Sequence, residues 1–392
     1  MTGPATEYRI IGSGPVALAC ALFMVRAGID PRRVHLSLPA AGTLAAPGGA
    51  PSSNGLRRML ALSDGSRQLL GRVVPMPAGG VIECIEVALS GHSGRTRIQA
   101  RDFDVAALGH VIAYPALVAA MRAAIDRMPF AADDTSTPQA ARPLAQPLTI
   151  HAEGLPPRSS RGSASPGGRS VSARDFNQTA LLTEAMAEHG GTTAYECFGD
   201  NGPLALLPAD PGHIPRYAVV WCDRPQVSAA RAALSPAQLS TALNEALASF
   251  ALPKNLLGRL QICAPVQTAP LTRLRRVNAA DDRDVWIGNA AQALHPVAGQ
   301  GLNLGLRDAF ELARILADNE YAKEPLMPGQ MLARFAAGRR IDRSLTTGVT
   351  DLLAAAFTWP LARPLQSLLL TTLDLLPPVR RPLARALLFG HR

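Results

Sequence analysis

Aromatic residues and lysines are scarce in this chain of 392 residues, which argues against nucleic acid as its partner. Phe, Trp and Tyr together make up 5% of the sequence, so few side chains are present on which bases could stack. Lys254 and Lys323 are the only lysines, and the net charge of +9 therefore rests on arginine. A basic surface of this kind suits anionic lipid or an anionic cofactor.

The chain also lacks clustered cysteines and long apolar runs. Its five cysteines, Cys20, Cys84, Cys197, Cys222 and Cys263, are widely spaced, which argues against both a zinc site and a disulfide framework and favours a reducing compartment. The sequence opens without a basic segment and an apolar run, so we expect no signal peptide. No stretch reaches the roughly 18 apolar residues of a transmembrane helix. We expect a cytoplasmic protein with no metal.

The N-terminal segment has the pattern of a dinucleotide-binding strand–turn–helix unit. A strand at Tyr8–Ile11 runs into the turn Gly12-Ser13-Gly14-Pro15-Val16-Ala17, a helix follows to Ala27, and a second strand covers Val34–Leu36. Gly12, Gly14 and Ala17 would let a pyrophosphate approach the helix N-terminus closely. The acidic residue that usually ends the second strand and holds the ribose is missing.

A second strand–loop–helix unit spans Asp284 to Leu316. It contains an apolar strand (285–287), a turn of small residues (288–291), a loop with two glycines (295–301) and an amphipathic helix that we expect to begin just after Gly301. The unpaired amides and the dipole at the start of that helix favour an anion or an electron-rich carbonyl. His295 is expected to be a residue of this loop, and no residue is assigned as a catalytic acid or base.

The segment GNAAQALHPVAGQGLNLGLRDA, which starts at Gly288, resembles the second flavin-binding motif of the aromatic-ring FAD monooxygenases. The form with Gly-Asn-Ala-Ala-Gln is similar to the ubiquinone-biosynthesis hydroxylases, in particular the 2-polyprenyl-6-methoxyphenol hydroxylase branch. The segments DFNQTA from Asp175 and GPLALLP from Gly202 are also similar to those hydroxylases. Asn289 stands where the family usually has Asp, and Glu153 stands where it has the Asp of an Asp-Gly pair.

The resemblance implies FAD as the cofactor and NADPH or NADH as the reductant. By this resemblance, twelve residues are expected to contact FAD: Gly12, Gly14, Ala17, Arg58, Gly288, Asn289, Pro296, Gly299, Gln300, Gly301, Leu302 and Asn303.

The resemblance also implies the fold, which is α/β: a Rossmann-like FAD-binding domain, as in p-hydroxybenzoate hydroxylase, with an antiparallel β-sheet substrate domain and a helical tail. We expect the FAD-binding domain to be formed by residues 1–75, 101–174 and 265–345, with a flexible loop at 155–174. Residues 76–100 and 175–264 would form the substrate sheet, and 346–392 the tail. The tail is apolar, with Leu365–Leu376 as a candidate amphipathic helix, and its last arginines suit the anionic surface of the inner membrane. Packing of the tail on the protein's own core or on a partner protein fits equally well.

The function implied is hydroxylation of the aromatic ring of a prenylated phenol in bacterial ubiquinone biosynthesis. Its oxygen donor would be a flavin C4a-hydroperoxide formed with O2. Two alternatives stay open: a scaffold of a quinone-biosynthesis complex in which flavin binding is weakened, and a hydroxylase of another aromatic substrate. The sequence does not fix the ring position, the tail length of the substrate, the electron donor or the oligomeric state.

Overall fold

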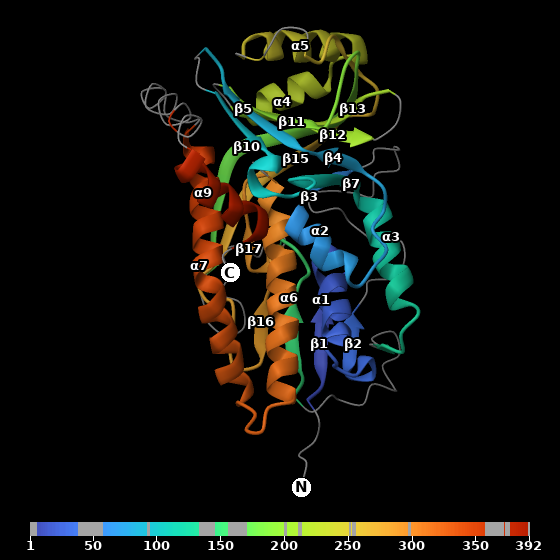
Figure 1. Ribbon diagram of the computed structural model, residues 1–392, viewed down its shortest axis with the longest axis vertical. Coiled ribbons are helices and arrows are strands. Elements are labelled where there is room, and N and C mark those ends of the chain that lie inside the picture. Colours follow the sequence, from blue (N-terminus) through green and yellow to red (C-terminus); the bar gives the residue numbers. More distant parts are fainter. Residues whose placement is uncertain are drawn as a thin grey trace.

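The protein is described here from a computed structural model, which places three sheets and their covering helices in one elongated body (Figure 1). The structure describes residues 6–37, 58–91, 95–132, 146–155, 171–199, 202–210, 214–250, 252, 256–296, 299–356, 372 and 377–390. The candidate helix 365–376 therefore lies outside the described residues except for Thr372, and most of the loop 155–174 does too. Among the described residues, no helix is both long enough and apolar enough to cross a membrane.

A five-stranded parallel sheet forms the centre of the lower half of the molecule in Figure 1. Its strands in spatial order are β16 (Asp284–Trp286), β9 (Leu148–His151), β1 (Tyr8–Ile11), β2 (Val34–Ser37) and β8 (Ala131–Ala132). Ile10, Ile150 and Val285 point to one face and are fully buried there. Parallel strands need crossover helices to cover them, and these apolar positions pack against those helices.

The helices of this half are mostly longer than those in the other half. They are α1 (Pro15–Arg26), α2 (Asp64–Gly71), α3 (Tyr114–Ile125), α6 (Gln300–Glu320) and α7 (Pro328–Ala356), with the 3-10 turns η1 (Pro31–Arg33) and η4 (Gly288–Ala290). The core combines sheet residues with residues from α1, α3, α6 and α7, such as Leu18, Met121, Leu312 and Phe335. Burial of these side chains, at about 1.5–3 kcal/mol each, is what holds α1 and α6 side by side.

A nine-stranded mixed sheet forms the upper half. Its path is β17 (Gln292–Ala293), β15 (Gln267–Arg276), β10 (Val171–Ala187), β13 (Arg216–Asp223), β12 (Pro203–Asp210), β11 (Thr193–Phe198), β5 (Cys84–Leu89) and β6 (Arg95–Gln99), with β14 (Leu260–Ile262) beside β10. Helices α4 (Pro225–Ala232) and α5 (Pro236–Ala248) cover one face, where Leu206 and Val219 pack with Leu239 and Leu243 (Figure 1).

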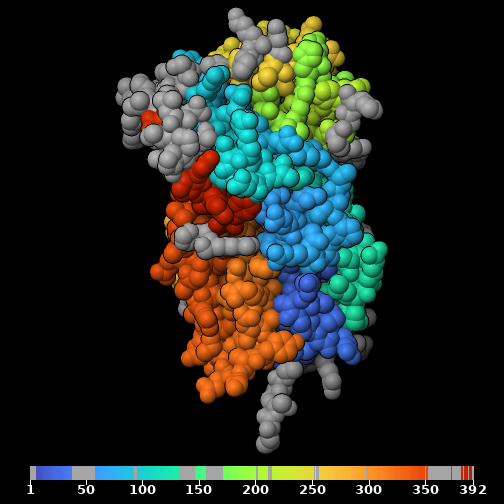
Figure 2. Space-filling model, viewed as in Figure 1, coloured from blue at the N-terminus to red at the C-terminus, as the bar shows by residue number. Residues whose placement is uncertain are grey.

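A small three-stranded antiparallel sheet and the last helix join the two halves. The sheet has the order β3 (Met59–Ser63), β7 (Gly109–Ala113) and β4 (Gly80–Ile82), and the 3-10 turn η2 (Ala100–Phe103) lies between β6 and β7. Helix α9 (Pro377–Phe389) contacts both α2 and η2, and its surface adjoins theirs in Figure 2. Leu388 is buried among residues of β4, β7 and β11, so this part of the tail packs on the protein itself.

Four expectations about boundaries were wrong. Residues 171–174, expected in a loop, begin the long strand β10, and residues 267–276, expected in the FAD-binding domain, form β15 of the nine-stranded sheet. β15 pairs along β10, and this pairing decides which sheet it belongs to. Helix α6 begins at Gln300 and not after Gly301, because Gly299 already turns the chain into the helix. Strand β4 (Gly80–Ile82), expected in the substrate sheet, pairs with β7 in the small three-stranded sheet.

Candidate cofactor site

The turn between β1 and α1 is shaped by two glycines. Gly12 has φ +135°, and a methyl group at its Cα would lie 2.5 Å from the carbonyl oxygen of Ala152, so only glycine fits there. Gly14 caps the N-terminus of α1, and among the described residues a methyl group at this position would meet no atom within 4 Å apart from its own chain neighbours. The backbone is therefore open in front of the first amides of α1, as close approach of a ligand requires.

The second glycine loop leads directly into α6. Gly299 is the N-cap of the helix, with φ +58°, and its amide donates to the carbonyl of Pro296 at 3.0 Å. Because the helix begins at Gln300, Gln300, Gly301 and Leu302 lie in its first turn. Their amides belong to the set that has no partner within the helix, and the positive end of the helix dipole adds to their field.

Asn303 ties this loop to the small sheet. Its side chain is 2% exposed, and its Oδ1 accepts from the amide of Ser63 at 2.9 Å. Its Nδ2 donates to the carbonyls of Gly299 at 2.8 Å and Ala61 at 3.2 Å. Three hydrogen bonds thus use the amide group to fix the loop against β3, and its contribution to ligand binding is to position Gly299–Leu302.

The starts of α1 and α6 meet at the turn 288–291. A methyl group on Gly305 would lie 2.9 Å from Val16 and 3.0 Å from the Cα of Gly288, so glycine at both positions permits this close packing. Asn289, in the same turn, points its Oδ1 to within 4.0 Å of where a methyl group on Gly301 would be. Three segments that are far apart in the sequence therefore surround one region.

Arg58 provides a cation near this region, immediately before β3. Its guanidinium lies 5.2 Å from the ring centroid of Tyr114, and its carbonyl accepts from the Tyr114 amide at 2.7 Å. Burial lowers the pKa of Arg58, and no carboxylate among the described residues counters that effect. A half-buried cation without a carboxylate partner favours an anionic ligand. Together with the open backbone at Gly14 and the two helix N-termini, it fits a dinucleotide with an electron-rich ring.

His295 lies at the border between this region and the nine-stranded sheet. It is 1% exposed, its Nε2 lies 2.9 Å from Oε1 of Gln178, and the ring of Phe176 meets it edge-on at 5.0 Å. Burial lowers the pKa of His295 to about 4, so the ring is neutral at pH 7. His295 therefore fixes the glycine loop to β10, a pairing that the spacing of the two residues in the sequence could not reveal.

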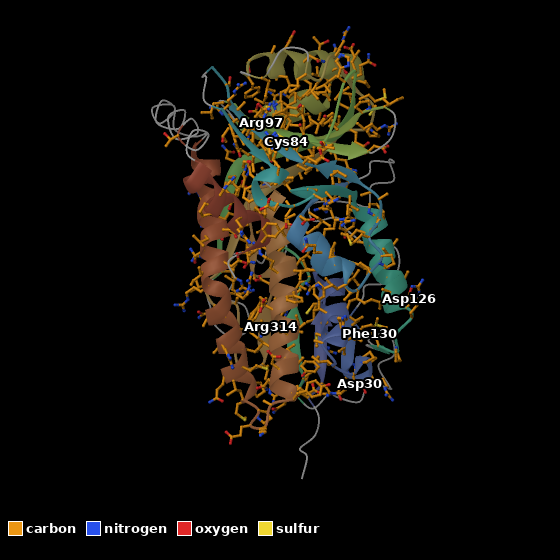
Figure 3. All side chains as sticks on the ribbon, viewed as in Figure 1. Asp30, Cys84, Arg97, Asp126, Phe130 and Arg314 are labelled. Atoms are coloured by element: carbon orange, nitrogen blue, oxygen red, sulfur yellow. The ribbon has the colours of Figure 1, made fainter. Side chains whose placement is uncertain are left out.

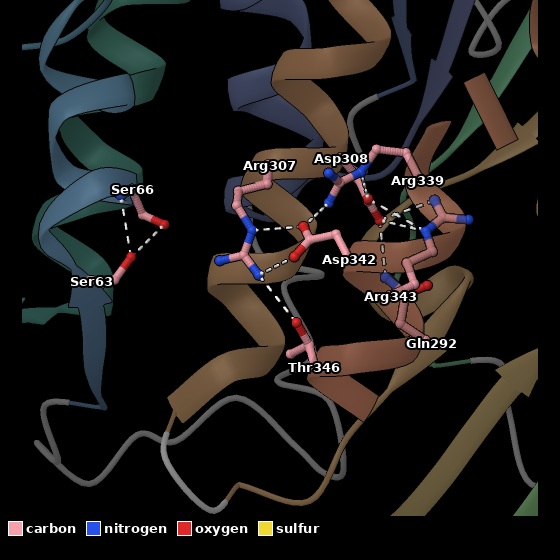
Figure 4. Close-up of polar contacts among 9 residues, drawn as sticks. All are labelled: Ser63, Ser66, Gln292, Arg307, Asp308, Arg339, Asp342, Arg343 and Thr346. Carbon is pink, nitrogen blue, oxygen red and sulfur yellow. Dashed lines mark hydrogen bonds and ion pairs between the residues drawn. The ribbon is translucent and has the colours of Figure 1, made fainter. Parts of the chain in front are cut away.

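An ion-pair network holds the other side of α6 (Figure 4). Asp308 is fully buried and contacts Arg339 Nε at 2.7 Å, Arg343 Nη2 at 3.0 Å and Gln292 Nε2 at 2.9 Å. The residue before Asp308, Arg307, contacts Asp342 through its Nε at 2.9 Å, and Arg339, one turn before Asp342 on α7, also pairs with it. The network fixes α6 to α7 and, through Gln292, to the strand that follows the turn 288–291.

Comparison with known proteins shows similarity to FAD-binding proteins. A family model for an FAD binding domain matches residues 157–327. An uncharacterised protein of Synechocystis is 26% identical over 79% of this chain and 77% of its own length. Ubiquinone hydroxylase UbiL of Rhodospirillum rubrum is 32% identical over 62% of this chain, but the match spans only 53% of that hydroxylase.

Solved structures show the same fold over the whole chain. The crystal structure of p-nitrophenol 4-monooxygenase PnpA from Pseudomonas putida has a TM-score of 0.67, with 16% identity over 99% of both chains. The expected α/β fold, a Rossmann-like FAD-binding domain with a second sheet, is thereby confirmed; that sheet is largely antiparallel, but β5 and β11 pair in parallel. The chain is therefore similar to FAD-dependent hydroxylases, among them hydroxylases of ubiquinone biosynthesis, and its cofactor is FAD.

Proposed function

We propose that this protein is a monooxygenase that hydroxylates the aromatic ring of a prenylated phenol intermediate in ubiquinone biosynthesis. The observation that supports this most is the convergence of two glycine turns, two helix N-termini and Arg58 on one region beside the nine-stranded sheet. The relatives named as ubiquinone hydroxylases support the choice of substrate class. Bound FAD, once reduced by NADPH or NADH, supplies the activation of O2 for transfer of one oxygen atom to an electron-rich ring.

The two turns would bind different parts of FAD. Gly12, Gly14 and Ala17 would admit the pyrophosphate to the start of α1, and Arg58 would lie along the cofactor as its counter-charge. The residues that would border the ribityl chain and the flavin ring are Gly288, Asn289, Pro296, Gly299, Gln300, Gly301, Leu302 and Asn303. Asn289 can both donate and accept hydrogen bonds but lacks the charge of the usual Asp.

The first amides of α6 would stabilise negative charge on the reduced ring. They have no partner within the helix, and they point along the helix axis with the positive end of the dipole. A site closed to water strengthens such interactions, and His295, which is buried and neutral, helps to close it from the side of β10.

The sheet face turned away from α4 and α5 would receive the substrate. Leu182, Val220 and Ala205 lie side by side there across β10, β13 and β12 and form an apolar row. An apolar wall next to a few fixed polar groups suits a phenol with an isoprenoid chain. We further propose that the protein is cytoplasmic and rests on the inner membrane surface through its basic tail, and that it assembles with other proteins of quinone biosynthesis.

Complementation of bacterial strains that each lack one quinone-ring hydroxylase tests this function. We expect the protein to restore ubiquinone in one of these strains, with loss of the corresponding unhydroxylated intermediate measured by mass spectrometry. If purified protein is yellow and folded but restores none of them, the substrate is another aromatic compound. If it stays colourless in excess FAD, the scaffold alternative replaces the enzyme.

A further inference from the structure

A group of stacked side chains surrounds Trp286, at the end of β16, and sequence reasoning missed it. The ring of His151 is parallel to the indole within 9°, with a centroid separation of 4.8 Å. The guanidinium of Arg276, from β15, lies 4.2 Å from the indole centroid. The aromatic ring therefore contacts one permanent cation and one imidazole that can become a second. We call Trp286, His151 and Arg276 the Trp286 stack.

Two carboxylates hold the imidazole of His151. Its Nε2 lies 2.8 Å from Asp284 Oδ1, its Nδ1 lies 3.5 Å from Glu153 Oε1, and its side chain is 19% exposed. Burial favours the neutral ring, but the hydrogen bonds and charges of Glu153 and Asp284 outweigh it and raise the pKa of His151. Arg276, across the indole, also interacts with the charge of Glu153. On β1, Arg9 lies two residues from Ile11, the strand partner of His151, and beyond it on the same face His35 of β2 pairs with Glu7.

The Trp286 stack connects the two turns assigned to FAD. On one side, His151 continues into Ala152 and Glu153, and the Ala152 carbonyl lies directly against Gly12. On the other side, Arg276 donates its backbone amide to Ala291 at 2.9 Å and its Nε to Ala290 at 3.5 Å, within the turn that carries Asn289. The amide of Ile287 donates to the carbonyl of His151 at 3.0 Å. Ala152, which contacts Gly12, and Ile287, which precedes Gly288, are each directly linked to His151. A shift of the imidazole can therefore move both turns.

The protonation state of His151 decides whether both carboxylates stay in place. A protonated imidazole donates from both nitrogens and satisfies Asp284 and Glu153 together, whereas a neutral imidazole has one N–H and satisfies only one of them. Glu153 has the longer of the two distances to the imidazole, 3.5 Å against 2.8 Å, so it is the one released. The backbone amide of Glu153 lies against Gly12, and Arg276 counters only part of the charge of its carboxylate, so a Glu153 without its imidazolium partner would repel the pyrophosphate of FAD.

We propose that the Trp286 stack is a positioning device that makes the affinity for FAD depend on pH, a proposal that rests on the assignment of the two turns to FAD. Because the paired form of His151 is the protonated one, its contribution is fully present below the ordinary histidine pKa. The contribution is lost as the pH rises through the raised value. FAD therefore binds most tightly in mildly acidic solution and less tightly in alkaline solution.

The dissociation constant of FAD, measured by flavin fluorescence on apoprotein from pH 6 to pH 9 at constant ionic strength, tests the proposal. We expect the constant of the wild type to rise at least about fivefold over this range, the lower end of typical coupling between two sites. In His151→Gln, which keeps a hydrogen-bonding group without a titrating charge, and in His151→Phe, which keeps the stacked ring, the rise should disappear. The matched control is His35→Gln, because His35 pairs with Glu7 at 3.0 Å on the same sheet and is similarly buried; it should keep the wild-type slope.

An unchanged pH slope in both His151 variants would overturn the proposal. If the wild type does not bind FAD at all, the cofactor assignment fails instead, and the fluorescence of Trp286 in the apoprotein then decides the question. The difference between wild type and Trp286→Phe should show a transition with pH that His151→Gln lacks. The same transition in His151→Gln would rule out His151 as the titrating group.

Discussion

Asp308 offers a direct test of how α6 is held in place. The substitution Asp308→Asn keeps the shape of the side chain and removes the charge from a position that is 0% exposed. Arg339 and Arg343 each lose a partner, while Gln292 faces an amide in place of a carboxylate (Figure 4). Removal of one member of a buried ion pair costs about 3–5 kcal/mol, because the remaining charge stays buried without compensation.

The structure places this substitution near the lower end of that range. Arg339 still pairs with Asp342, and the side chain of Arg343 is 14% exposed, so both arginines keep some compensation. We therefore expect a loss of about 3 kcal/mol. Since the unfolding entropy of a chain of 392 residues is about 0.8 kcal/mol/K, Tm should fall by about 4 °C.

Thermal unfolding followed by circular dichroism, on apoprotein at pH 7, measures the effect. The matched control is Asp318→Asn on the same helix, since Asp318 is 64% exposed and pairs at 2.8 Å with Arg314, which lies on the outer side of α6 in Figure 3. An exposed pair contributes less than about 1 kcal/mol, so Tm of the control should change by about 1 °C at most. Equal shifts in the two variants would refute the claim that the buried network fixes α6.

The same network predicts a pH dependence. Burial alone would raise the pKa of Asp308, but the charges of Arg343 and Arg339 outweigh it, and the pKa is lowered from its ordinary value of 3.8. The stability that Asp308 contributes is therefore present above that ordinary value and is lost as the pH falls through the lowered one. The difference in Tm between wild type and Asp308→Asn should shrink below about pH 4.

Three further outcomes are expected. Arg58→Gln should raise the dissociation constant of FAD about tenfold, as loss of a charged hydrogen bond does, without lowering the Tm of the apoprotein; a large drop in Tm would mean that Arg58 serves the fold. Asn303→Ala should lower Tm by several degrees, because each buried group left without a partner costs about 1–3 kcal/mol, and an unchanged Tm would contradict this. Between pH 6.5 and pH 4, the Tm of His295→Phe should fall less than the Tm of the wild type. In this range the buried histidine is neutral in the folded protein and takes up a proton on unfolding, which destabilises the wild type.

The elements around the two glycine turns could be predicted from the sequence. Strand 8–11, the helix that ends at Ala27 and strand 34–36 were expected where β1, α1 and β2 lie, because strand-to-helix turns leave a clear local pattern of glycines between apolar runs. Strand 285–287 was likewise expected within one residue of the bounds of β16. Local chemistry decides these segments, and the sequence carries it directly.

Pairing over long distances could not be predicted. β15 follows β10 because their edges match, and nothing in residues 267–276 alone distinguishes that sheet from the other. His295 contacts Gln178, and His151 stacks on Trp286, although each pair is separated by more than 100 residues in the sequence. Such contacts depend on how the strands are arranged in the sheets. The sequence shows each polar or aromatic residue but does not show which residue it contacts.

Titration of FAD into apoprotein carrying Gly14→Val tests most directly the central claim, that FAD lies against the start of α1 next to α6. The account predicts a dissociation constant at least about tenfold above that of the wild type, together with an unchanged Tm of the apoprotein. A Cβ at Gly14 meets no atom of the other described residues beyond its chain neighbours within 4 Å, and the side chain would enter the space assigned to the pyrophosphate. Gly338→Val, at an equally open position on the outer side of α7, should leave both quantities unchanged. Wild-type affinity in Gly14→Val would contradict the account.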